Sequence, residues 1–127
     1  MRKIPKATGP RQVVCFYPVE LATSEGDVYL FLSKDVYSEF LFQTGIENDN
    51  SIASVVKHLS LLMKEENFAR FGKAPFTLVM HKHEEHTDKI MDVIRPHGGT
   101  VMFNDPYVAQ EMTGPMATVY DRLMKGS

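Results

Sequence analysis

The segment VYLFLSKDVYSEFLF, residues 28–42, constrains the fold of this chain more than any other part of the sequence. It consists of two apolar runs of strand length on either side of the polar residues 33–35, Ser-Lys-Asp. Val, Tyr, Leu and Phe at this density favour extended backbone, and aspartate is common where two strands are connected. We therefore predict a hairpin with strands at 28–33 and 36–44, joined at residues 33–35.

The sequence on both sides of this hairpin predicts a mixture of strands and helices. Strands are expected at 12–21, before the hairpin, and at 76–80 and 100–103 after it. A helix at 52–63 is predicted by apolar residues at three-and-four spacing, with three candidate N-caps before it: Asp49, Asn50 and Ser51. A second helix is expected at about 84–95.

The C-terminal region is expected to hold two short helices. Asp105 is a candidate cap with Pro106 at the first helical position, and the helix that they open should run to about Met112. Gly114 and Pro115 should interrupt it, because proline removes a helical hydrogen bond and clashes with the preceding turn. A last amphipathic helix then follows.

The order of the predicted elements is three strands, helix, strand, helix, strand, helix. The first three strands are close enough in sequence for antiparallel hairpins, and the last two each follow a helix, which favours parallel crossovers. We predict one α/β domain over residues 1–127, with an irregular arm at 1–10. Its fold class is ribonuclease H-like: a five-stranded mixed sheet in the order βββαβαβα, flanked by helices.

Composition restricts the class of protein. A length of 127 residues with 43% hydrophobic and 24% charged residues is typical of one soluble globular domain. The net charge of −2 provides no broad cationic field for nucleic acid or an anionic membrane. No apolar run approaches the roughly 18 residues that span a bilayer, so no membrane association is expected. Cys15 is the only cysteine, which predicts a small buried residue in a protein of the reducing cytoplasm.

Two segments carry a resemblance to a known family. Residues 10–21, PRQVVCFYPVEL, resemble the opening of integrase and transposase catalytic cores, and YLFLSKDVYSEFLF is similar to the second and third strands of those cores. Asp35 and Ser38 match an Asp and a Ser of the family hairpin. The resemblance covers about residues 10–103. It implies a context of DNA integration or transposition, DNA as a possible partner, and a homodimer.

The resembled enzymes use three carboxylates, usually Asp, Asp and Glu, which hold two divalent metal ions for phosphoryl transfer. In this chain the first position falls on Tyr17, the second on His81 or Lys82, and the third near residues 116–118, Met-Ala-Thr. None of these is an acid, and the nearest acids are the following: Glu20, Glu111 and Asp121. The resemblance therefore implies a degenerate active site without a cofactor, or Mg²⁺ or Mn²⁺ if activity survives.

The histidine-rich stretch at residues 81–86, HKHEEH, offers a different interpretation. His81, His83 and His86 are candidate ligands for zinc or another transition metal, since imidazole and carboxylate suit such ions. Alternatively, the stretch is a polar connection in which Glu84 and Glu85 favour the start of a helix.

Three function hypotheses follow. The first is an inactive integrase-core-like domain that acts in nucleic-acid association or assembly. The second is a metal-binding or metal-dependent protein that uses the histidine cluster. The third is a protein-interaction module without a nucleic-acid role. His58, on the predicted 52–63 helix, is expected to be exposed to solvent and belongs to none of these sites.

Overall fold

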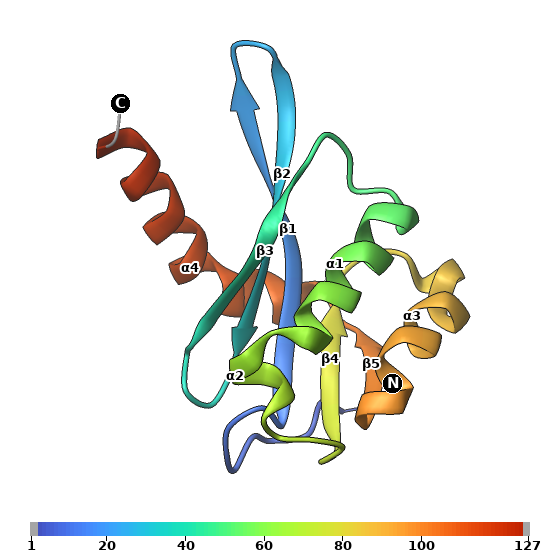
Figure 1. Cartoon of the computed structure of the whole chain (residues 1–127). Helices are drawn as coiled ribbons and strands as arrows, with labels where there is room; N and C mark the ends of the chain where they lie inside the picture. Colours follow the sequence, from blue (N-terminus) through green and yellow to red (C-terminus); the bar gives the residue numbers. More distant parts are fainter. Residues whose placement is uncertain (1–2, 126–127) are drawn as a thin grey trace.

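A five-stranded mixed sheet forms the centre of the protein (Figure 1). The computed structural model describes the backbone of residues 3–125 and the side chains of residues 3–122. The strand order is β3-β2-β1-β4-β5. The first three strands are antiparallel neighbours, and β4 and β5 are added in parallel. The bounds are β1 Val13–Thr23, β2 Gly26–Asp35, β3 Leu41–Glu47, β4 Phe76–Met80 and β5 Gly99–Phe103.

Helices cover both faces of this sheet. One face carries α1 (Ile52–Lys64), α2 (Glu66–Ala69) and α3 (Thr87–Ile94), and the other carries α4 (Asp105–Lys125) (Figure 1). Two short 3-10 helices flank α3, η1 at Glu84–His86 and η2 at Arg95–His97. The predicted ribonuclease H-like order of three strands, helix, strand, helix, strand, helix is confirmed. The sequence did not predict the short helix α2.

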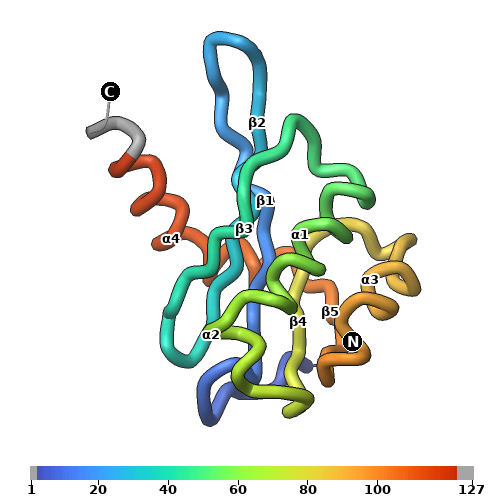
Figure 2. The backbone as a smooth tube through the Cα atoms, in the orientation of Figure 1, coloured from blue at the N-terminus to red at the C-terminus, as the bar shows by residue number. Residues whose placement is uncertain are grey.

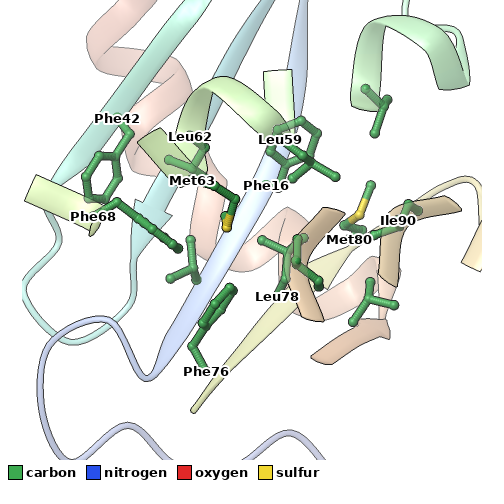
Figure 3. Close-up of a cluster of buried hydrophobic side chains, with 14 of the residues drawn as sticks. Phe16, Phe42, Leu59, Leu62, Met63, Phe68, Phe76, Leu78, Met80 and Ile90 are labelled. Carbon is green, nitrogen blue, oxygen red and sulfur yellow. The ribbon is translucent and has the colours of Figure 1, made fainter. Parts of the chain in front are cut away.

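The central strand β1 is buried on both faces, as its continuous apolar run predicts. Val14 and Phe16 pack under α1 and α3, whereas Val13 and Cys15 pack under α4. The larger of the two cores is shown in Figure 3, where Phe68 lies between Phe42 and Phe76. Rings in such edge-to-face contacts add stability beyond the area that they bury. Among the described residues, no helix is long and apolar enough to cross a membrane.

The predicted position of the connection between the two hairpin strands, residues 33–35, was wrong. Residues 33–35 belong to β2 and are buried, and the chain turns at residues 36–40 instead. Asp35 is satisfied there by three donors: the backbone N–H of Arg11, the backbone N–H of Tyr37 and the Ser38 hydroxyl. A buried polar group is stable when such partners are present. Two of these partners are local and the third, Arg11, comes from 24 residues away, and together they allow β2 to continue through Asp35.

The predicted break at Gly114 and Pro115 was also wrong, because α4 continues through both residues. Proline has no N–H to donate to the carbonyl four residues earlier, which here belongs to Glu111. The Lys34 ammonium donates to that Glu111 carbonyl oxygen at 3.1 Å and satisfies it. The helix also begins one position earlier than expected, since the Asn104 side chain, not Asp105, accepts from the Tyr107 N–H.

Candidate functional site

Tyr17, His81 and Met116, three of the residues that the integrase resemblance singled out, line one cavity of about 370 Å³. Tyr17 is on β1, His81 directly follows β4, and Met116 is on α4. The parallel register pairs Cys15 with Val79, so two residues further along each strand Tyr17 and His81 meet on the same face. Their ring centroids are 4.6 Å apart. The remaining lining residues come from α4: Asp105, Val108, Ala109, Met112 and Thr113.

The chemistry of this lining does not fit the two-metal centre of the resembled enzymes. Mg²⁺ requires hard oxygen ligands in near-octahedral geometry, and a two-metal site needs several carboxylates to offset its charge. Asp105 is the only carboxylate among the lining residues. The phenol of Tyr17, the imidazole of His81 and the thioether of Met116 line the cavity, and none of them is an acid.

The electrostatics of the cavity favour a neutral imidazole at His81. Burial lowers the pKa of His81, and the positive charge of Lys82 lowers it further. The Asp105 carboxylate acts in the opposite direction and raises this pKa. A buried neutral imidazole can accept or donate a hydrogen bond but does not attract an anion by charge.

The three nearby acids lie outside this cavity. Glu111 forms an ion pair with Lys34 at 3.3 Å. Asp121 is exposed on α4, and Glu20 lines a second, wider hollow. The cavity therefore contains Tyr17, His81 and Met116 but none of the three acids that lie nearest to them in sequence.

The second hollow is an apolar groove of about 1040 Å³ beside the cavity. It lies between the projecting β1–β2 hairpin and the C-terminal half of α4, which diverge from each other in Figure 2. Tyr17 and Met116 line both hollows. Ile46 and Tyr120, which also line the groove, are 57% and 43% exposed, and the Tyr120 hydroxyl donates to the Glu20 carbonyl at 3.1 Å. Exposed apolar surface of this kind is typical of interaction sites.

The histidine-rich stretch is divided between two places. His83 and His86 lie close to each other, with ring centroids 6.0 Å apart, and the Glu85 carboxylate joins them. His81 lies in the Tyr17 cavity and is not part of this group. The sequence therefore identified two of the three clustered residues, and Glu85 had been assigned only to the helix start.

The sequence prediction for His58 was wrong, because its side chain is buried. The imidazole stacks on Phe31 with ring centroids 4.1 Å apart, and its nitrogens lie 2.7 Å from the Thr44 hydroxyl and 2.7 Å from the Glu47 carboxylate. A signal for burial was present in the sequence. His58 lies three residues after Val55 and four before Leu62, on the apolar face of α1.

Cys15 is buried, as the sequence predicted. Burial raises the pKa of its thiol to about 12, with a contribution from the negative charge of Glu111. A thiol with so high a pKa is not a nucleophile near neutral pH, since the thiolate is the reactive form. The residue therefore contributes packing to the face covered by α4.

We expect NMR titration of the imidazole protons to place the pKa of His81 below the usual value of about 6.5. Asp105→Asn will lower this pKa further, because it removes the charge that favours the imidazolium. A surface variant on the other face of the sheet, Asp92→Asn, provides the control.

The lowered pKa of His81 also makes stability depend on pH. Since the unfolded chain binds the proton at higher pH than the folded chain, the contribution of His81 to stability is complete above about pH 6.5. It is lost as the pH falls through the folded pKa.

Comparison with known proteins shows similarity in structure but not in sequence. No protein-family model and no curated protein sequence matches the chain. One chain of the simian T-cell lymphotropic virus intasome, solved in complex with PP2A regulatory subunit B56 gamma, superposes with a TM-score of 0.72 and 8% identity. The match covers 98% of this protein and 45% of that chain, so the protein spans less than half of its relative.

The integrase catalytic core domain of HTLV-2, solved as a dimer in complex with magnesium, superposes with a TM-score of 0.68 and 5% identity. This match covers 95% of the protein and 77% of that core. Similarity at such low identity establishes the chain path and leaves the activity open. The protein has the ribonuclease H-like fold of a retroviral integrase catalytic core.

Proposed function

We propose that this protein is a catalytically inactive integrase-core domain that acts in nucleic-acid association or assembly. One observation carries the proposal: Tyr17, His81 and Met116, which lie at or near the positions that the resemblance assigns to the family's acids, line one cavity. That these three side chains line the same cavity supports the assignment, because the acids of the resembled enzymes also have to meet at one place. Asp105 is the one carboxylate among the lining residues, and Glu111 pairs with Lys34 outside the cavity.

Association with a second copy is part of the proposal. The HTLV-2 core of the same fold is described as dimeric. Among the side chains that the structure describes, five large apolar ones are substantially exposed: Tyr37, Phe40, Ile46, Leu61 and Tyr120. Ile46 and Tyr120 line the same groove, and exposed apolar surface of this kind supports an interface.

The activity arm of the test is a strand-transfer and nuclease assay on DNA ends with Mg²⁺ and with Mn²⁺. We expect no metal-dependent product, because a two-metal displacement requires carboxylate ligands that this cavity does not provide. An active integrase core assayed in parallel shows that the substrate and buffer are competent. Robust metal-dependent cleavage that Glu20→Ala abolishes would show that Glu20 serves as a ligand and that the proposal is wrong.

The association arm measures DNA binding by fluorescence anisotropy at increasing salt, and self-association by sedimentation. A nucleic-acid role predicts binding that weakens steeply with salt, since each neutralised phosphate releases a counterion. Self-association without DNA binding supports the assembly role alone. A chain that shows neither property contradicts the proposal and favours the third hypothesis, a protein-interaction module.

A further inference from the structure

We propose that His83, Glu85 and His86 form a binding site for Zn²⁺ at the start of α3. Each residue offers one ligand atom, and the three atoms lie within 4.8 Å of one another. The site is separate from the Tyr17 cavity, which contains His81. Zinc binding at this site therefore does not depend on whether the Tyr17 cavity has any activity.

A contact outside the cluster orients the first of these ligands. The Nε2 atom of His83 lies 2.9 Å from the backbone carbonyl oxygen of Asn50, so Nε2 carries the proton and donates it. This hydrogen bond leaves Nδ1 as the nitrogen that can bind an ion. Metal-binding histidines usually donate their other ring N–H to a carbonyl or carboxylate, which sets the tautomer and the ring orientation.

The backbone at His83 brings the three side chains together. His83 has a φ of 77°, in the left-handed region that residues other than glycine seldom adopt. This conformation turns the chain sharply between β4 and η1, so residues two and three positions further along fold back toward His83. Strained backbone of this kind is concentrated at functional sites, where surrounding contacts maintain it. Here the hydrogen bond to Asn50 is such a contact.

The set of donors identifies the class of ion. Two imidazoles and one carboxylate form a ligand set that catalytic zinc sites use, with a fourth position left to water. Imidazole nitrogen is a poor ligand for Mg²⁺ and Ca²⁺, which prefer oxygen. Tetrahedral bonds of about 2.0 Å separate ligand atoms by about 3.3 Å. The Glu85 and His86 atoms are already 3.7 Å apart, and the exposed Glu85 side chain can rotate inward.

The test is calorimetric titration of the protein with ZnCl₂ at pH 7, comparing the wild type with His86→Ala and Glu85→Gln. We expect one equivalent to bind the wild type, and each variant to lose at least about tenfold in affinity, since even changes beyond the direct ligands cost 10–100-fold. His97→Ala and Glu84→Gln are the matched controls and should bind like the wild type. Neither residue belongs to the cluster.

Further readouts make the proposal falsifiable. Zn²⁺ should raise the Tm of the wild type and not that of His86→Ala, because only a folded site binds the ion. Equal affinity in the wild type and His86→Ala overturns the site. Loss of binding in His81→Ala to the same extent as in His86→Ala also overturns it, because His81 would then be a ligand.

Discussion

His58→Ala will lower the free energy of unfolding by about 3 kcal/mol. Two effects add in this value: buried hydrogen bonds are lost, and a cavity is left in the core. The substitution removes a ring that is 1% exposed and stacks on Phe31. It also removes the hydrogen-bond partner of Thr44 and one partner of Glu47. The site is tightly packed, since a Cβ atom at Gly45 would lie 3.2 Å from the imidazole. No single water molecule or neighbouring side chain can replace all three contacts: the hydrogen bonds to Thr44 and Glu47 and the stacking on Phe31.

The neighbouring residue Lys57 provides a matched control for this prediction. Its ammonium lies 2.8 Å from the same Glu47 carboxylate, but its side chain is 61% exposed. An exposed ion pair contributes less than about 1 kcal/mol, so Lys57→Ala should have a small effect. Urea denaturation at pH 7 measures both variants. If the two substitutions cost the same, the charge of Glu47 stabilises this region and the buried ring does not.

The same carboxylate predicts the response of this network to acid. Hydrogen bonds from Lys57 and His58 lower the pKa of Glu47 below its usual value. The folded state therefore keeps this carboxylate ionised to lower pH than the unfolded chain does. The stabilisation is present above the unfolded pKa and is lost as the pH falls through the folded pKa. The difference in stability between the wild type and His58→Ala should accordingly decrease in acid.

Arg11→Ala will also destabilise the protein by about 3 kcal/mol, because it empties a large buried site. The Arg11 side chain is among the largest that are fully buried. Its guanidinium lies 5.0, 5.4 and 4.8 Å from the centroids of Phe68, Phe71 and Phe76, respectively. It donates one hydrogen bond, at 2.6 Å, to the Ala74 carbonyl oxygen. Packing and cation–π attraction both disappear when the side chain is truncated.

Arg11→Met is the informative comparison for this site, and it should cost less than about 1 kcal/mol. Methionine keeps contact with the three aromatic rings and removes a charge whose burial is unfavourable. The unfavourable burial is visible in two ways: it lowers the pKa of Arg11, and the Nε and Nη1 atoms have no hydrogen-bond partner among the described residues. If Met costs as much as Ala in urea denaturation, then the charge itself stabilises the aromatic cluster.

Patterns between near neighbours determined much of the fold. The three-and-four spacing of apolar residues in α1 and the apolar run in β1 predicted those elements, because side-chain direction repeats with the local backbone geometry. The order of elements then predicted three antiparallel strands followed by two parallel ones, since hairpins are antiparallel and helix crossovers are parallel and right-handed. The resemblance placed Tyr17 and His81, and the structure brings them together in one cavity.

What the tertiary structure alone decided was which polar groups find partners far away in sequence. Asp35 is buried at the end of β2, where Arg11, 24 residues away, adds a hydrogen bond to those from Tyr37 and Ser38. Helix α4 passes Pro115 because Lys34, 77 residues from Glu111, satisfies the carbonyl that the proline leaves free. His58 is buried because β3 and Phe31 surround it. Local propensity reflects only that a polar residue in a strand or a proline in a helix is unfavourable. The hydrogen bonds that compensate for it form only when the whole chain folds.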